Sequence, residues 1–467
     1  MRSFDIRTWG RPAAWVGLAA AAFHAAYAWA GASWLILVYL FALVRLAGLE
    51  PWRGRYYAGL AVGLLIAIGR LDFFWGIFSA GSLALWYVYA FWIGLFVALA
   101  GACLRWSGGA WGWVLVPFLW TGLEYFRSEL YYLRFSWLNP GYAGAGASWQ
   151  PLVGAAGMYG AGFLLASVAA AAGFLWLRSK AAALALLAAS VGGLALCGLA
   201  AAGSPQPAPA RTVHLAGIQM ECPTEPEVLG RLNQLIAEHP ETELIVLSEY
   251  TFMDPVPARV KAWCRQHHRH LVVGGEDPAP GNGFYNTAFV IGPEGEIVFR
   301  QAKCVPIQFF KDGRPAPAQK LWDSPWGKIG ICICYDLSYR LVTDRLVKLG
   351  AQALVVPTMD AIGWGQRQHQ LHGRVAPVRA AEYALPIFRV ASSGISQWVD
   401  ARGRVLAAAP CPGEGAVISA ALTLGRPGRL PPDRWVAPLA VAIAALCLCA
   451  LAARAALRRL GSKHAIP

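Results

Sequence analysis

The first 203 residues contain seven apolar stretches, separated by short loops except for a longer loop at about 128–158, and this pattern limits the possible fold more than any other feature. An eighth apolar stretch lies near the C-terminus. A helix needs about 20 mostly apolar residues, at about 1.5 Å each, to cross the hydrocarbon layer of a bilayer. We therefore expect membrane-spanning helices at residues 13–30, 33–48, 56–78, 81–104, 110–127, 159–177, 181–202 and 435–453, of which the first two are short enough to form a tilted or partly interfacial hairpin.

The amino-acid composition agrees with a membrane protein. Hydrophobic residues make up 57% of the 467 residues and charged residues only 14%, whereas a soluble protein is about half apolar and about a quarter charged. The 21 Trp, 16 Tyr and 20 Phe also fit a chain with much material at membrane interfaces.

The net charge of +14 is concentrated in short loops beside the apolar stretches, and little of it lies between residues 211 and 430. With seven spans before that segment and one after it, the short basic loops all fall on one side of the membrane, and the long loop at about 128–158, which carries Arg134, is the exception on the far side. Basic loops favour the cytoplasmic side, so the segment itself is expected on the opposite side. A nucleic-acid-binding protein would carry its charge on the soluble domain, so no nucleic-acid partner is expected.

Changes in composition predict the domain boundaries. Residues 204–210 are rich in proline and read as a linker, and residues 211–430 alternate strand and helix signals, which is typical of an α/β domain. The predicted order is a membrane domain at 1–203, the linker at 204–210, the α/β domain at 211–430, a C-terminal transmembrane helix at 435–454 and a basic cytoplasmic tail at 455–467.

Hydrophobic periodicity places the elements of the α/β domain. We expect strands at residues 212–219, 244–248, 271–275, 285–291, 296–301, 328–334, 353–357 and 386–391. We expect helices at residues 228–238, 258–267, 338–349 and 368–383.

The most reactive candidate is Cys334, at the end of the apolar stretch from Ile329 to Asp336. Isoleucine alternates there with small residues, as in a buried strand. A cysteine between a strand and a helix can be held rigidly, and a nearby helix N-terminus favours its thiolate form. Cys332, on the same face two residues earlier, is expected to be a core residue.

Glu249 and Lys303 are the polar residues that best complement such a cysteine. Glu249 ends an apolar strand, and Lys303 follows another. A carboxylate can take the thiol proton, and an ammonium group can stabilise the oxyanion of a tetrahedral intermediate. Each residue alone is more often an ordinary surface, solvated or core residue, so the pattern by itself leaves the interpretation open.

The remaining cysteines do not predict a metal or a cofactor. None of the ten cysteines forms a CxxC pair or another pair with metal-ligand spacing. Cys304, beside Lys303, is a rival nucleophile, although no strand-to-helix element presents it.

Residues 211–420 resemble the nitrilase superfamily of carbon–nitrogen hydrolases. The matching segments are Ala216–Gln219, Leu247–Glu249, Tyr285–Ile297, Lys303, Ile331–Asp336, Arg379–Glu382, Ser393–Ser396 and Asp400–Gly403. The resemblance implies a four-layer αββα sandwich. It also implies that Glu249 is the general base, that Lys303 stabilises the oxyanion and that Cys334 is acylated.

The preceding residues resemble the membrane part of the apolipoprotein N-acyltransferase family. The matching segments are Trp120–Arg127, Phe135–Trp137, Gly141–Tyr142, Gln150 and Gly157–Gly160. This resemblance implies a bacterial inner-membrane enzyme with seven spans, a periplasmic catalytic domain and a final span. Its acyl donor would be a phospholipid, and its acceptor would be the N-terminal amine of a lipidated apolipoprotein.

The chain departs from this family after the lysine. The family has a Pro-Phe-Gly-Glu run there with a second carboxylate, but this chain has none; Asp312 or Gln308 is the candidate replacement. Asp336 stands where the family has glutamate. Tyr335, through its backbone N–H, and Trp364, in a lid between Gly363 and Gly365, are further supporting candidates. The departure keeps two alternatives open, namely a membrane-tethered amidase or acyltransferase with another amine acceptor, and a non-catalytic membrane scaffold.

Overall fold

The computed structural model describes residues 6–106, 110–202, 211–413 and 415–463, and the chain divides into two compact units. The first unit contains the residues up to Ala202 together with those from Pro432 onward. The second unit runs from Gly203 to Pro431. The expected linker at 204–210 lies outside the described residues.

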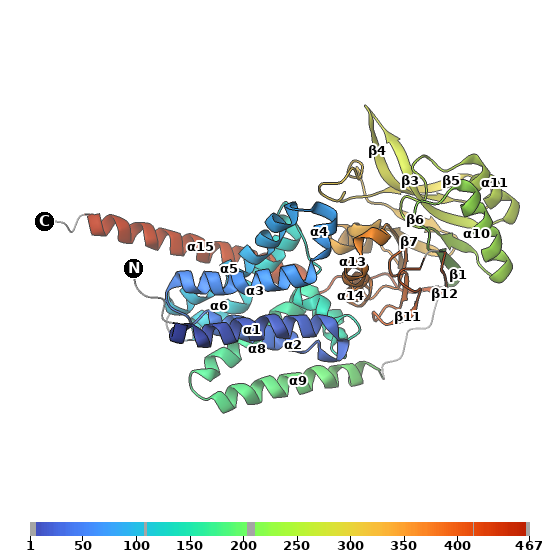
Figure 1. The fold of residues 1–467 in the computed structure, drawn as a ribbon. Coiled ribbons are helices and arrows are strands. Elements are labelled where there is room, and N and C mark those ends of the chain that lie inside the picture. The colour runs from blue at the N-terminus through green and yellow to red at the C-terminus, as the bar shows by residue number, and fades with distance from the viewer. Residues whose placement is uncertain (1–5, 107–109, 203–210, 414, 464–467) are drawn as a thin grey trace. The chain divides into compact units, whose positions relative to one another are not determined.

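The first unit is a bundle of helices (Figure 1). Seven of the eight expected apolar stretches each coincide with one helix, whereas the stretch at 56–78 is divided into α3 and α4; the short helix α7 is additional. The helices are α1 (Ile6–Ala28), α2 (Leu35–Leu46), α3 (Trp52–Arg70), α4 (Phe73–Phe78), α5 (Gly81–Trp106), α6 (Trp111–Tyr125), α7 (Gln150–Ala156), α8 (Met158–Trp176), α9 (Lys180–Ala202) and α15 (Asp433–Lys463).

Four of these helices are apolar and long enough to cross a membrane, judged by length and composition over the described part of the chain. They are α5, α8, α9 and α15. The count of seven spans plus one therefore stays a prediction. Helix α15 also continues to Lys463, through most of the segment expected to be a basic tail.

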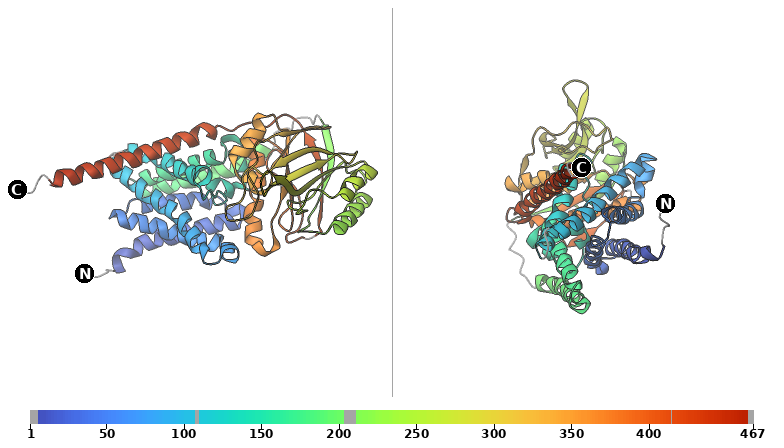
Figure 2. Two further views of the ribbon diagram at one scale, coloured as in Figure 1. Left: turned by 90° about the horizontal axis from the view of Figure 1, so that it is seen from above. Right: turned by 90° about the vertical axis from the view of Figure 1, so that its left-hand side faces the viewer.

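The last helix of the chain, α15, belongs to this first unit and packs along α6 and α8 (Figure 2). Its close approach to α6 depends on Gly122, because a Cβ atom there would overlap the carbonyl oxygen of Ala440. At its start, the buried carboxylate of Asp433 accepts a hydrogen bond from the backbone N–H of Tyr159 at 3.0 Å. A carboxylate is stabilising at a helix N-terminus, so Asp433 fixes the start of α15 to the start of α8.

The second unit contains two six-stranded sheets. The first sheet has the order β12-β1-β2-β3-β4-β5, and the second has the order β11-β10-β9-β8-β7-β6. The strands are β1 (Arg211–Ile218), β2 (Leu244–Val246), β3 (His270–Ala279), β4 (Gly283–Ile291), β5 (Ile297–Ala302), β6 (Leu321–Ser324), β7 (Gly327–Ile331), β8 (Ala353–Thr358), β9 (Ile387–Ala391), β10 (Gln397–Val399), β11 (Val405–Ala408) and β12 (Val417–Leu424). The neighbours β1, β2 and β3 are parallel, as are β7, β8 and β9.

Helices cover the outer face of each sheet, which gives four layers. Helices α10 (Glu225–Glu238) and α11 (Ala258–His267) share an apolar core with β1 to β4. Helices α12 (Arg340–Lys348), α13 (Gln366–Gly373) and α14 (Val375–Tyr383) lie on the side of the second sheet. The inner faces of the two sheets meet where Gly217 of β1 lies against Val390 of β9. This α/β architecture agrees with the nitrilase-like fold that the sequence predicts.

Several predicted boundaries are wrong, most notably around Cys334. The strand expected to reach residue 334 ends at Ile331, and the helix expected from residue 338 begins at Arg340. Between them lies a 3-10 turn, Cys334–Ser338, because the Asp336 carboxylate accepts the backbone N–H of Ile333 and closes a turn.

The other differences between the predicted and the observed elements occur where the hydrophobic pattern of the sequence is weak. The helix expected at 368–383 is two helices, which meet at Arg374. Strands β6, β10, β11 and β12 were not expected. Three of them form sheet edges and β10 is only three residues long, so their apolar patterns are weak or short.

Candidate active site

The structure brings the three predicted residues together at the ends of strands from both sheets. Glu249 lies three residues after β2, Lys303 directly follows β5, and Cys334 lies three residues after β7. The Lys303 Nζ atom is 2.8 Å from Oε1 of Glu249, and both side chains are fully buried. The Cys334 thiol, only 2% exposed, interacts with both charged groups.

The backbone around Cys334 has an unusual conformation. Cys334 has φ = 54°, in the left-handed region that residues other than glycine rarely adopt. Such strain persists only where the surrounding structure holds it, and it is commonly found at active sites. Here the Cys334 Sγ atom donates to the carbonyl oxygen of Met359 at 3.6 Å.

A close packing of two backbones places Glu249. Gly274 of β3 lies against this segment, and a Cβ atom there would come within 2.7 Å of the Glu249 Cα atom. The Glu249 Oε2 atom accepts the backbone N–H of Met359 at 2.7 Å. The Met359 segment therefore contacts both the carboxylate and the thiol.

Asp312 supplies a second carboxylate to the cluster. Its Oδ2 atom is 2.8 Å from Lys303 Nζ, on the loop where the sequence lacks the expected glutamate. The Asn286 side-chain amide donates to Glu249 Oε1 at 2.6 Å and to Asp312 Oδ1 at 2.8 Å. The Tyr250 hydroxyl also donates to Asp312 at 2.9 Å. Lys303 thus lies between two carboxylates that share one amide.

No sequence motif singles out Asn286, although it lies within a segment that carries the resemblance. The available signal was its position, because asparagine is uncommon in the middle of a buried strand such as β4.

The protonation states of Lys303 and Cys334 follow from their burial and from the charged groups beside them. Burial by itself lowers the pKa of Lys303, but Glu249 and Asp312 outweigh it and hold that pKa well above its ordinary value. Burial raises the pKa of the Cys334 thiol, Glu249 adds to this effect, and Lys303 opposes it. The resting site therefore contains an ammonium group and a neutral thiol. The sequence pattern favours a thiolate through a nearby helix N-terminus. In the structure a 3-10 turn begins at Cys334 and the α-helix begins only at Arg340.

Asp336 connects the two segments that carry Lys303 and Cys334. Its buried carboxylate accepts the backbone N–H groups of Cys304 at 3.0 Å, Val305 at 2.7 Å and Ile333 at 3.3 Å. Burial raises the pKa of Asp336 to about 6. Tyr335 is also buried, and its ring meets that of Tyr339 edge-on at 4.9 Å.

Trp364 lies farther along the chain on a short 3-10 turn, Ile362–Trp364, that precedes α13. Its ring contacts Phe310 edge-on with 5.9 Å between the centroids. Gly365, which ends the turn, has φ = 85°, a conformation that favours glycine. A lid at this position stays a prediction.

The other cysteines near the cluster have different surroundings. Cys332 is completely buried. The Cys304 Sγ atom donates to Gln319 at 2.8 Å, and burial together with Asp336 raises its pKa to about 12. Over the described ranges, no group of three or more His, Cys, Asp or Glu side chains could hold a metal ion.

Comparison with known proteins gives two family matches. The apolipoprotein N-acyltransferase N-terminal domain matches residues 16–171, and the carbon-nitrogen hydrolase family matches residues 214–431. The apolipoprotein N-acyltransferase of Nitrosomonas europaea is 28% identical over 360 residues, which cover 67% of this chain and 70% of that protein. The apolipoprotein N-acyltransferase of Shewanella oneidensis is 25% identical over 430 residues, which cover 80% of this chain and 81% of that protein. These matches confirm both resemblances predicted from the sequence.

Proposed function

We propose that this chain, which belongs to the apolipoprotein N-acyltransferases within the carbon–nitrogen hydrolase superfamily, transfers an acyl chain from a phospholipid to the N-terminal amine of a diacylglyceryl-cysteine apolipoprotein. The observation that carries the proposal is the buried cluster of Glu249, Lys303 and Cys334 in a chain that also contains long apolar helices. No metal or cofactor is needed for this chemistry.

In the first half-reaction, the Cys334 sulfur attacks the carbonyl carbon of a phospholipid ester while Glu249 takes the thiol proton. Negative charge develops on the carbonyl oxygen, and the Lys303 ammonium, with the backbone N–H of Tyr335, stabilises it. The ester C–O bond then breaks, Glu249 returns the proton to the leaving oxygen, and the lysophospholipid departs. The acyl chain remains as a thioester on Cys334.

In the second half-reaction, the amine of the apolipoprotein attacks the thioester carbon. Glu249 accepts a proton from the attacking nitrogen, the C–S bond breaks, and the proton returns to the sulfur. A neutral resting thiol fits this cycle, because Glu249 then has a proton to take and to give back.

We also propose that the chain lies in the inner membrane with the second unit on the periplasmic side. The basic loops beside the apolar helices support this orientation. Cys222 is an exposed cysteine of the second unit and provides the test. A membrane-impermeant maleimide should label it in intact spheroplasts, and labelling only after lysis would contradict the orientation.

The amidase alternative was motivated by the missing glutamate after Lys303. Asp312 weakens that motive, because it places a carboxylate against the Lys303 ammonium at 2.8 Å. The direct test of function is mass spectrometry of a diacylated lipopeptide incubated with the purified protein and phospholipid. The proposal expects the mass to rise by one acyl group at the N-terminal amine. An unchanged lipopeptide together with hydrolysis of soluble amides would favour the amidase.

Replacing Asp312 with asparagine should lower kcat by about 10- to 100-fold, because the oxyanion-stabilising ammonium loses one of its two charge partners. The matched control is Asp323→Asn on the exposed surface, which should keep the wild-type rate. Initial rates of lipopeptide acylation measure both. Equal rates for the two variants would mean that Asp312 does not support the reaction.

A further inference from the structure

The backbone of Met359 is the contact that Glu249 and Cys334 share. The N–H of Met359 donates to the Glu249 carboxylate at 2.7 Å, and its carbonyl oxygen accepts the Cys334 thiol at 3.6 Å. Met359 directly follows β8, where the strand has ended and no regular ladder fixes the chain. Something else must therefore hold this residue in place.

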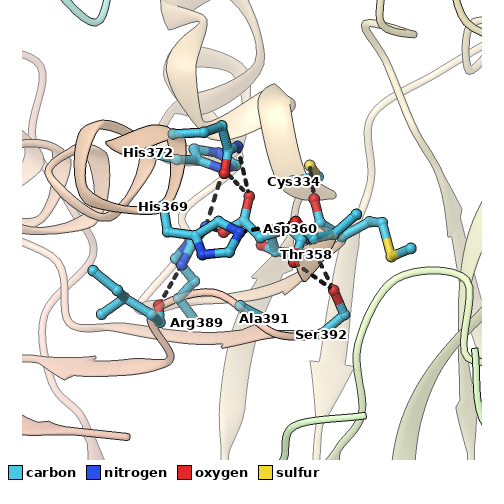
Figure 3. A network of polar contacts seen from close by, with 12 residues as sticks. Cys334, Thr358, Asp360, His369, His372, Arg389, Ala391 and Ser392 are labelled. Carbon is cyan, nitrogen blue, oxygen red and sulfur yellow. Dashed lines mark hydrogen bonds and ion pairs between the residues drawn. The ribbon is translucent and has the colours of Figure 1, made fainter. Parts of the chain in front are cut away.

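The backbone of Asp360, the next residue, is fixed by one hydroxyl group (Figure 3). The N–H of Asp360 donates to Ser392 Oγ at 3.0 Å, and the same hydroxyl donates to the carbonyl oxygen of Asp360 at 3.0 Å. Ser392 follows β9, and its own N–H donates to Thr358 of β8 at 3.1 Å. The two parallel strands are thus joined beyond the point where their ladder ends.

The Asp360 side chain is held by polar residues of α13 and β9. Its Oδ1 atom contacts His372 Nδ1 at 2.7 Å and accepts from Gln368 Nε2 at 2.9 Å, both on α13. Its Oδ2 atom contacts Arg389 Nη2 of β9 at 2.5 Å. Burial would raise the pKa of Asp360, but His372 and Arg389 hold it below its ordinary range, so the group is a carboxylate.

The cluster around the Asp360 carboxylate is buried. The side chains of Asp360, Gln368, His372, Arg389 and Ser392 are each at most 2% exposed. A buried ion pair is weak grounds for stability, because desolvation of the charges offsets their attraction. The presence of this buried cluster is better explained by the position in which it fixes the backbone at Met359 and Asp360. The residue that it fixes, Met359, contacts both the proposed base and the proposed nucleophile through its backbone.

We propose that Asp360 is a positioning residue for the acyltransfer reaction. Held by Ser392 on its backbone and by Gln368, His372 and Arg389 on its carboxylate, it fixes the Met359 peptide, and this peptide sets the geometry of the Glu249 carboxylate relative to the Cys334 thiol. The proposal rests on the proposed function, but the geometry that it describes can also be measured without acyl transfer.

The test is Ser392→Ala, which removes both backbone contacts of Asp360 without leaving a buried charge unpaired. Because small misplacements of reacting groups cost up to about 100-fold in rate, we expect kcat to fall by about 10-fold while KM for phospholipid stays within about twofold. Gln368→Leu, which removes one contact to the carboxylate, should have a smaller effect in the same direction.

The matched control is Thr343→Val. Thr343 is equally buried, its hydroxyl contacts Tyr383 at 2.6 Å, and it lies on α12 rather than in this cluster. The Thr343→Val variant should lose about as much thermal stability as Ser392→Ala and should keep the wild-type kcat. If Ser392→Ala loses no more activity than this control, or if its KM rises while kcat is unchanged, Asp360 does not position the reacting groups.

A second measurement separates this proposal from the proposed function. Alkylation of Cys334 by iodoacetamide, followed by peptide mass spectrometry, is compared with that of the exposed Cys222 in the same molecule. In Ser392→Ala, alkylation of Cys334 should slow by about threefold or more, because Glu249 no longer receives the thiol proton in the right geometry. An unchanged rate would overturn the proposal. A faster rate would also overturn it, because it would mean that the substitution only opens the site.

Discussion

Replacing Cys334 with alanine is expected to abolish acyl transfer, with a loss of at least about 10⁴-fold in kcat, as for nucleophiles that form covalent intermediates. The sulfur is the only atom of the proposed site that bonds to the acyl group, and neither Glu249 nor Lys303 can replace it. Wild-type protein incubated with phospholipid alone should gain the mass of one acyl chain on the peptide that contains Cys334. The Cys334→Ala protein should gain none.

Cys332→Ala is the control for this experiment. Cys332 lies two residues earlier and is fully buried, so its replacement removes a thiol from the same segment without touching Glu249 or Lys303. It should acylate the lipopeptide at a rate within about a few-fold of wild type, at a stability cost of about 1 kcal/mol for the small cavity. Acyl transfer that survives in Cys334→Ala, or an adduct on Cys304 in the wild type, would refute the assignment of the nucleophile.

The architecture was largely readable from the sequence because both of its parts depend on hydrophobic periodicity. Every apolar stretch of the first unit is largely helical, although the one at 56–78 is divided into two helices, and the eight expected strands of the second unit are all present. The strands that were missed lack this signal. β11, for example, is largely exposed and contributes little to the core.

The site was predictable only in part. Glu249, Lys303 and Cys334 each follow an apolar strand, a position that can be recognised in the sequence, and the resemblance grouped them. Met359 could not have been identified in this way, since it acts through backbone atoms, which any residue possesses. Asp312 could be named as a candidate, but only the fold of the loop after Lys303 brings its carboxylate back to the ammonium group.

The protonation state of Cys334 shows a further limit of local patterns. The sequence pattern indicates a helix N-terminus near Cys334, which favours a thiolate, whereas burial and the neighbouring Glu249 raise the pKa of the thiol. Burial arises from residues far apart in the chain, so the sequence around Cys334 does not reveal it.

Replacing Lys303 with methionine is expected to damage both activity and stability. The reaction would lose the cation that we propose stabilises the oxyanion, so kcat should fall by about 10³-fold or more. Two buried carboxylates, Glu249 and Asp312, are then left without the ammonium group that lies 2.8 Å from each. Breaking a buried ion pair in this way costs about 3–5 kcal/mol, which should appear as a lower midpoint of thermal unfolding in detergent. Lys320→Met, on the exposed surface, should change neither quantity.

A double variant, Lys303→Met with Asp312→Asn, separates the two effects. Removing the Asp312 charge relieves the repulsion with Glu249, so the unfolding midpoint should recover part of the way toward wild type. Activity should not recover, because the oxyanion still has no ammonium group beside it. Recovery of activity together with stability would mean that Lys303 only holds the two carboxylates together, and that the backbone N–H of Tyr335 stabilises the oxyanion without it.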